Sequence, residues 1–422
     1  MSSPVLQRAR TRHSLRNQTI IVIISAIIPY ILRFLFIDQQ QNLNGLHVTL
    51  VAGLLGGVIS IFAIRNFNKY PGAESVSSVL SLTSLIYGGI VVAFLVSRID
   101  YVRMVLVGNY VLCVSLLFAE QLLGSERKKL RIAIVQGGNA YPFDARNIEW
   151  IPIHDPATPV ENFDALTVDL RADLPDDWER RITELALIGV PVYHIKHLRE
   201  SLTGMVEIEH LAETSYGTLA PPHIYIIAKR VIDTIVAAFF LLLLLPLMVL
   251  VAVIIRLDSP GPAIFKQTRI GFGGHPFTVR KFRTMRTVQA DNNGDDRNAA
   301  MTQANDVRIT RIGRFLRKSR IDELPQLINI LRGEMSLIGP RPEAAILSSW
   351  YEKEIPLYRY RHIVMPGVTG WAQINQGHVT NVEDVTTKLH YDFYYIKHLS
   401  PWIDVLIALR TFLTMVSGHG AK

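Results

Sequence analysis

The chain has 422 residues, of which 49% are hydrophobic, with a formal net charge of +8 and one cysteine. At about 100–200 residues per domain, this length allows roughly two to four domains. The single cysteine, Cys113, excludes a disulfide scaffold and a cysteine-based zinc site, and its place in an apolar run predicts a packing role. The mean hydropathy of +0.23 excludes a disordered chain. The positive charge favours an anionic partner.

Four apolar runs occupy the N-terminal third, at 19–37, 46–64, 78–96 and 102–123. Each is near the roughly 20 residues that a helix needs to cross the hydrocarbon layer. We therefore expect a four-helix transmembrane bundle over 19–123, after a cytoplasmic tail at 1–18. Arginine and lysine gather before the first run and after the fourth, as they do on cytoplasmic segments. Both ends of the bundle are expected to face the cytoplasm.

The segment 124–215 predicts a small α/β domain. Three strands and one helix are expected, at 131–136, 165–170, 191–195 and 176–188 respectively. This order favours a parallel, Rossmann-like sheet. Only a glycine pair, Gly137-Gly138, follows the first strand, where a dinucleotide site would need G-x-G-x-x-G. A structural or regulatory role is therefore favoured over nucleotide binding.

A second hydrophobic element lies at 224–256 and includes 25 successive residues whose one charge is Asp233. Pro246 interrupts it, and proline kinks or breaks a helix. A spanning helix would also place the basic segment that follows on the outer side, against the positive-inside bias. We therefore expect a re-entrant membrane helix that breaks at Pro246 and returns. With a mainly helical cytosolic domain over 257–422, the fold class is an α+β membrane protein.

Residues 256–341 carry 16 Lys and Arg against 8 Asp and Glu, so one fifth of the chain holds the whole net charge. Within them, Ser319 or Asp322 can begin a helix to about Leu331. Asp322 and Glu323 would then lie at a helix N-terminus, which favours their ionised forms and attracts phosphate. One carboxylate can attack or bind while the other holds a metal, and hard oxygen ligands beside phosphate suggest Mg²⁺. The alternative is an acidic capping pair without catalytic function.

Several cations surround this pair in the sequence, and a guanidinium binds phosphate through paired hydrogen bonds. They are Lys281, Arg283, Arg317, Arg320 and Arg341. Nucleic acid is disfavoured as the partner because the segment adjoins a membrane element and no nucleic-acid module is recognisable, whereas anionic lipid headgroups compete as ligands. The polar residues 286–305 predict a loop, and the apolar stretch 401–416 predicts an interfacial or a buried helix.

From Lys229 to about Met415, the chain resembles the bacterial sugar transferases, the monotopic polyprenyl-phosphate phosphoglycosyl transferases. Six stretches carry the resemblance: KRVID at 229–233, FKQTR at 265–269, KFRTM at 281–285, DELPQ at 322–326, MSLIGPRP at 335–342 and PGVTGWAQ at 366–373. The N-terminal runs and the α/β segment are similar to those of long-form members of the undecaprenyl-phosphate glucose or galactose phosphotransferase type. Many members have Ser-Pro at the helix break, where this chain has Leu245-Pro246.

The resemblance implies transfer of a sugar 1-phosphate from a UDP-sugar to undecaprenyl phosphate, with release of UMP. This is the first membrane step of exopolysaccharide, capsule or O-antigen synthesis. It implies that Asp322 is the nucleophile of a covalent phosphosugar intermediate and that Glu323, with Asp322 beside it, binds Mg²⁺. Five further residues match basic positions of the family's site or lie in its motifs: Lys281, Arg283, Arg317, Arg341 and Asp392.

The same resemblance implies the bacterial inner membrane as location, a catalytic domain on the cytoplasmic face, membrane lipids as partners, and a homodimer as one option. Two other functions stay open. One is a catalytically inactive membrane regulator or scaffold of polysaccharide synthesis, which would release no UMP from a UDP-sugar. The other is a basic membrane-surface protein that binds lipid or nucleic acid, with strong salt dependence and no need for Mg²⁺.

Overall fold

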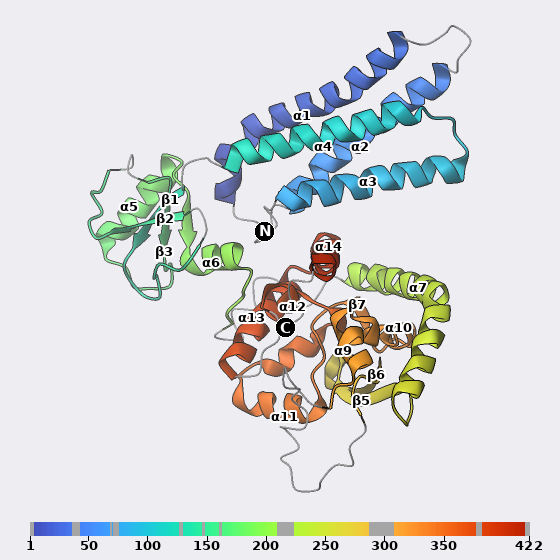
Figure 1. The fold of residues 1–422 in the computed structure, drawn as a ribbon. Coiled ribbons are helices and arrows are strands. Elements are labelled where there is room, and N and C mark those ends of the chain that lie inside the picture. The colour runs from blue at the N-terminus through green and yellow to red at the C-terminus, as the bar shows by residue number, and fades with distance from the viewer. Residues whose placement is uncertain are drawn as a thin grey trace. The chain divides into compact units, whose positions relative to one another are not determined.

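The computed structural model describes residues 4–35, 43–67, 70, 76–125, 130–145, 148–159, 163–208, 223–286, 308–376 and 382–417. The chain forms two compact units, residues 1–204 and 205–422 (Figure 1). Within the described ranges, five helices are long and apolar enough to cross a membrane. They are α1 (Pro4–Leu35), α2 (Leu43–Phe67), α3 (Val76–Ser97), α4 (Arg103–Ser125) and α7 (His223–Asp258). These helices and the parallel sheets described below agree with a membrane protein of mixed class.

The helices α1 to α4 contact one another, and small residues of α2 lie where they approach most closely. A Cβ atom on Gly57 would meet Val22 of α1 at 2.6 Å. The Tyr87 hydroxyl of α3 donates to the Gly53 carbonyl at 3.2 Å and also bonds the side chain of Asn109 in α4. Cys113 is buried in α4, as its apolar surroundings predict. Because α1 begins at Pro4, helix covers most of the segment expected as a tail.

The α/β segment forms a four-stranded, fully parallel sheet in the order β2-β1-β3-β4. Its elements are β1 (Leu130–Val135), β2 (Ile148–Ile153), β3 (Ala165–Val168), α5 (Asp176–Leu187), β4 (Val192–His194) and α6 (Ile195–Thr203). The parallel arrangement is confirmed, but β2 and α6 were not predicted. The strand β2 contains Pro152, which an edge strand tolerates. The helix α6 is capped by the His194 ring, which accepts from the Lys196 N–H and is an unusual N-cap.

The unit 205–422 contains two small sheets among helices. An antiparallel hairpin pairs β5 (Ile264–Ile270) with β6 (Pro276–Phe282), and a parallel pair joins β7 (Ser336–Ile338) to β8 (Gly367–Thr369). The other elements are η3 (Phe272–Gly274), α9 (Arg311–Lys318), η4 (Ile321–Glu323), α10 (Gln326–Leu331), α11 (Ala345–Glu354), η5 (Tyr358–Ile363), α12 (Trp371–Asn375), α13 (Val382–Lys397) and α14 (Pro401–Ser417). Most of the loop expected at 286–305 lies outside the described residues.

The helix α7 continues through Pro246 instead of ending there. Proline removes one backbone hydrogen bond, and the remaining bonds on either side keep the chain helical. Figure 1 shows that α7 changes direction along its length. The expected interruption of the helix is therefore replaced by a bend, and the re-entrant path stays a prediction.

The helix α14, which covers the apolar stretch at 401–416, is buried on one side and exposed near its C-terminus. It therefore combines features of the two predicted alternatives, a buried and an interfacial helix. Ile403, Leu406 and Ile407 are buried, whereas Phe412 and Met415 are exposed. One side of α14 therefore packs in the core of its unit, and its C-terminal turns present apolar side chains to the surroundings.

Candidate active site

The acidic pair lies in a turn of 3₁₀ helix, not in the first turn of an α-helix as expected. Arg320 precedes it with a left-handed backbone (φ 59°), which separates the turn from α9. Pro325 has no N–H to donate to the carbonyl of Ile321, so α-helical bonding cannot run through this stretch. The α-helix begins only at Gln326. The helix α10 is also short, so neighbouring side chains set the charge of the two carboxylates.

Three cations from three segments of the chain contact Glu323. Its Oε1 atom lies 2.6 Å from Arg341 Nη2, 3.0 Å from Lys281 Nζ and 3.6 Å from Arg320 Nη1. Although burial disfavours the charged form, Arg341 and Lys281 hold the pKa of Glu323 well below its usual range. Glu323 is therefore ionised at neutral pH and anchors the cations around it.

Asp322 is as buried as Glu323, but it differs in its hydrogen bonding and in the direction of its pKa shift. Its side chain is buried, and its Oδ1 atom has no hydrogen-bond partner among the described residues. Burial and then repulsion from Glu323 raise the pKa of Asp322 to about 6, against the opposing pull of Lys281 and Arg341. A buried carboxylate with an uncompensated oxygen is costly for the fold, and such groups are typical of functional sites.

The segment 335–342, which contains Arg341, and the segment 366–373 contact each other through their backbones. The Gly339 N–H donates to the Thr369 carbonyl at 2.9 Å, and the Gly367 N–H donates to the Pro340 carbonyl at 3.0 Å. A Cβ atom on Gly339 would lie 2.4 Å from the carbonyl oxygen of Met365, so this approach requires glycine. The Arg341 guanidinium also donates to the Val368 carbonyl at 3.2 Å. These contacts fix the direction in which Arg341 reaches Glu323.

The structure brings only part of the expected site together. Lys281 and Arg341 meet at Glu323, whereas Arg317 bonds the Thr284 hydroxyl through Nε at 2.9 Å. Arg283 is buried and donates to the carbonyls of Ser259 and Pro260, just after α7. In this structure, Arg283 therefore binds the end of α7, which sets it apart from the cations at Glu323.

Asp392 does not contact the acidic pair directly. Its carboxylate pairs with Arg361 at 2.8 Å, and both side chains are almost fully buried. Arg361 also donates to the backbone carbonyl of Arg341 at 2.9 Å. Asp392 is thus connected to the acidic pair through two arginines. Arg361 was not expected, because it belongs to none of the six stretches and only the fold reveals its contact.

Asp322 and Glu323 are the carboxylates of this turn that could contribute ligands to a metal ion. No cluster of three or more His, Cys, Asp or Glu side chains that could hold a metal occurs within the described residues. Mg²⁺ commonly takes one or two carboxylates and completes its shell with phosphate oxygens and water. The unpartnered oxygen of Asp322 and the adjacent Glu323 supply two carboxylates in one turn.

Comparison with known proteins places this site in a family. Residues 224–418 match the family model described as "Bacterial sugar transferase". The UDP-N-acetylgalactosamine-undecaprenyl-phosphate N-acetylgalactosaminephosphotransferase of Aeromonas hydrophila is 40% identical over 383 residues, which cover 90% of this chain and 88% of that protein.

Two further relatives match a little less than half of this chain. The UDP-glucose:undecaprenyl-phosphate glucose-1-phosphate transferase of Caulobacter vibrioides is 44% identical over 195 residues, covering 46% of this chain and 71% of the relative. The protein of the same name from Escherichia coli is 42% identical over 198 residues, covering 46% of this chain and 40% of the relative. The range matched by the family model, 224–418, contains the acidic turn and the cations that surround it.

Proposed function

Because the chain belongs to the bacterial sugar transferase family, as a long-form polyprenyl-phosphate phosphoglycosyl transferase, we propose that it transfers a sugar 1-phosphate from a UDP-sugar to undecaprenyl phosphate. The products are UMP and undecaprenyl-diphosphate-sugar, which starts an exopolysaccharide, capsule or O-antigen. The observation that carries the proposal is the buried Asp322 carboxylate, with one oxygen unpartnered, next to a glutamate surrounded by cations.

The reaction proceeds in two displacements at one phosphorus atom. An Asp322 oxygen attacks the β-phosphorus of the UDP-sugar, and the bond to the α-phosphate breaks, with its electron pair leaving on UMP. A phosphate oxygen of undecaprenyl phosphate then attacks the same phosphorus, and the Asp322 carboxylate leaves. Covalent catalysis of this kind lets a water-soluble donor and a lipid acceptor use one site in turn. With a pKa of about 6, Asp322 is mostly an ionised nucleophile at neutral pH.

The surrounding cations orient the phosphates and neutralise their charge. Phosphoryl transfer mainly requires positioning and electrostatic stabilisation, which fixed cations supply. Burial and the nearby Arg341 lower the pKa of Lys281 to about 8, so this ammonium is mostly charged at neutral pH. When bound, Mg²⁺ would be held by Glu323 and Asp322 and would neutralise phosphate charge. Removal of divalent cations with EDTA is expected to abolish UMP release, and added Mg²⁺ to restore it.

The donor is a UDP-linked hexose or N-acetylhexosamine. The glucose-1-phosphate transferases match 46% of this chain, whereas the N-acetylgalactosaminephosphotransferase matches 90% of it. This favours UDP-N-acetylgalactosamine over the glucose or galactose donor expected from the sequence. A panel of UDP-sugars, tested for UMP release with purified protein and undecaprenyl phosphate, decides between them.

The proposed location is the bacterial inner membrane, with α1–α4 as a transmembrane bundle, α7 as a re-entrant helix and the catalytic unit in the cytoplasm. Both ends of α7 bind the catalytic unit, which supports the re-entrant path. Lys229 bonds Asp404 near one end, and the carbonyl of Ser259, just beyond the other end, accepts from Arg283. A straight helix of 36 residues would separate its ends by about 54 Å. A single cysteine at position 258, in a Cys113→Ala background, is expected to react with a membrane-impermeant thiol reagent only from the cytoplasmic side.

The test of the chemistry is Asp322→Asn. This variant is expected to lose UMP release and covalent labelling by a phosphosugar, while it still inserts into the membrane. Asp258→Asn is the matched control, because Asp258 is exposed at the end of α7 and outside the site. Full activity in Asp322→Asn would overturn the assignment. Absence of UMP release by the unmodified chain with every donor would instead favour the inactive regulator.

A further inference from the structure

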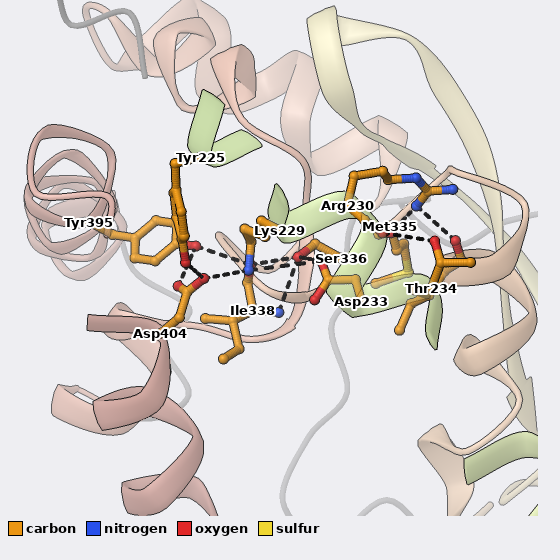
Figure 2. A network of polar contacts seen from close by, with 11 residues as sticks. Tyr225, Lys229, Arg230, Asp233, Thr234, Met335, Ser336, Ile338, Tyr395 and Asp404 are labelled. Carbon is orange, nitrogen blue, oxygen red and sulfur yellow. Dashed lines mark hydrogen bonds and ion pairs between the residues drawn. The ribbon is translucent and has the colours of Figure 1, made fainter. Parts of the chain in front are cut away.

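The motif at 229–233 has no place in the proposed chemistry, yet the structure gives it a buried polar network (Figure 2). Tyr225, Lys229 and Asp233 are spaced four residues apart and therefore share one face of α7. The Asp404 carboxylate of α14 accepts from Lys229 Nζ and from the Tyr225 hydroxyl, each at 2.6 Å. Lys229 also lies 3.8 Å from Asp233 Oδ2. We call these four residues, together with Ser336 and Tyr395, the α7 latch.

The latch is buried, so its charged groups require partners at fixed positions. Asp233 and Asp404 are 5% and 7% exposed, so their charges depend on protein partners. Two carboxylates face one ammonium, and the hydroxyls of Tyr225, Tyr395 and Ser336 supply the remaining hydrogen bonds (Figure 2). Displacement of α7 relative to α14 would leave a buried charge without its partner, which is strongly unfavourable.

The latch reaches the active site through β7. The Ser336 hydroxyl donates to Asp233 Oδ2 at 2.5 Å, and the Tyr395 hydroxyl lies 3.1 Å from the carbonyl of Ile338. Ser336 and Ile338 are the two ends of β7, and Arg341, which contacts Glu323, follows three residues later. The strand β7 therefore contacts the latch through the Ser336 hydroxyl and the Ile338 carbonyl, and Arg341 follows shortly after the strand.

A second connection runs through α10. The Arg230 guanidinium of α7 donates to the carbonyls of Ile330 at 2.8 Å and Met335 at 3.4 Å. These carbonyls lie at the end of α10 and just before β7, and α10 begins three residues after Glu323. Both segments that carry the acidic pair and its arginine are thus tied to one short stretch of the membrane helix.

We propose that Lys229, Asp233 and Asp404 are positioning residues for the transfer reaction. They hold β7 so that Arg341 reaches Glu323 in the acidic turn. The inference rests on the proposed function for its catalytic consequence. A misplacement of about 1 Å can cost two orders of magnitude in rate. Loss of one hydrogen bond of the latch is therefore expected to lower kcat more than it changes the KM for the donor.

Two variants test the latch, with a matched control. Ser336→Ala removes a hydroxyl that joins β7 to α7, and Tyr395→Phe removes one that lies between Asp404 and Ile338. Thr234→Ala removes a hydroxyl that bonds within α7, to the carbonyl of Arg230. We expect kcat for UMP release to fall about tenfold in the first two, with the KM for UDP-sugar changed by less than about threefold. Thr234→Ala should keep both constants within about twofold.

Hydrogen exchange of the full chain in detergent, read by mass spectrometry over 319–342, gives a measure that needs no activity. Ser336→Ala and Tyr395→Phe should accelerate exchange across this stretch, and Thr234→Ala should not. If the unmodified chain releases no UMP with any donor, the proposed function fails while exchange still tests the latch. Unchanged exchange in both latch variants, or equal acceleration in Thr234→Ala, overturns the latch. If Ser336→Ala does not fold, Tyr395→Phe, which keeps the ring, gives the decision.

Discussion

The N-terminal helices and α7 are all apolar enough to cross a membrane, but they bury different kinds of polar group. The buried polar side chains described in α1–α4 are neutral: Ser25, Thr49, Ser60, Thr83 and Asn109. The helix α7 instead buries Asp233 beside a largely buried Lys229. Neutral polar groups add only a small free energy to the association of apolar helices, whereas buried charged groups are costly and are usually functional. The type of buried polar group therefore separates a packing helix from one that belongs to an active site.

The largest test of this difference is Lys229→Met compared with Asn109→Ala. The first leaves two buried carboxylates without their cation and is expected to cost about 3–5 kcal/mol of stability. The second removes a neutral hydrogen bond between helices and should cost about 1 kcal/mol. Thermal unfolding of both variants in the same detergent measures the ratio. Equal losses would contradict the distinction between the two sets of helices.

A second test asks whether the packing of α1–α4 matters to the reaction. Gly57→Val places side-chain atoms where Val22 already lies within 2.6 Å of an ideal Cβ, and overpacking of this kind costs about 1–3 kcal/mol. Because residues 205–422 form a separate compact unit, UMP release should stay within about twofold of the unmodified protein. A loss of activity that exceeds the loss of folded protein would show that the two units are coupled.

A third test concerns pH. Burial, with repulsion from Arg361 and Arg359, lowers the pKa of His362 to about 4. The unfolded chain binds this proton near pH 6.5 and the folded chain only near pH 4. The stabilisation is therefore present above pH 6.5 and is lost as the pH falls toward 4, by up to about 1.4 kcal/mol per unit. Urea unfolding at several pH values should show this slope, and His362→Gln should reduce it.

The sequence predicts the apolar helices well because length and hydropathy alone decide them. Each of the four N-terminal runs lies within one of the helices α1–α4, apart from one residue at the start of the fourth run and two at the end of the first. The parallel sheet follows from strand and helix periods, whereas the edge strand with Pro152 escapes the pattern. The break at Pro246 and the helix at Asp322 were placed by local rules for proline and capping. Hydrogen bonds on both sides of Pro246 keep α7 continuous. The missing N–H of Pro325 delays the start of the α-helix to Gln326.

Part of the candidate site was predictable, and the reason lies in its chemistry. Carboxylates and phosphate-binding cations have recognisable types, so Glu323, Lys281 and Arg341 could be named before their contacts were known. The type of a residue does not, however, reveal which residue it will contact in the fold. Asp392 binds Arg361, and Arg283 binds carbonyls just after α7, because long-range packing assigns these contacts and no local period encodes them.

The separation of Lys229 from Asp404 along the chain has a consequence for biogenesis. The two residues are 175 positions apart. At about 5–20 residues per second, the ribosome needs roughly 10–35 seconds after α7 to supply the partner on α14. During that interval Asp233, one turn away on the same helix, is the counter-ion within reach of Lys229. The newly made α7 therefore carries a counter-ion for Lys229 on the same helix, and Asp404 adds a second one once the last helix has been made.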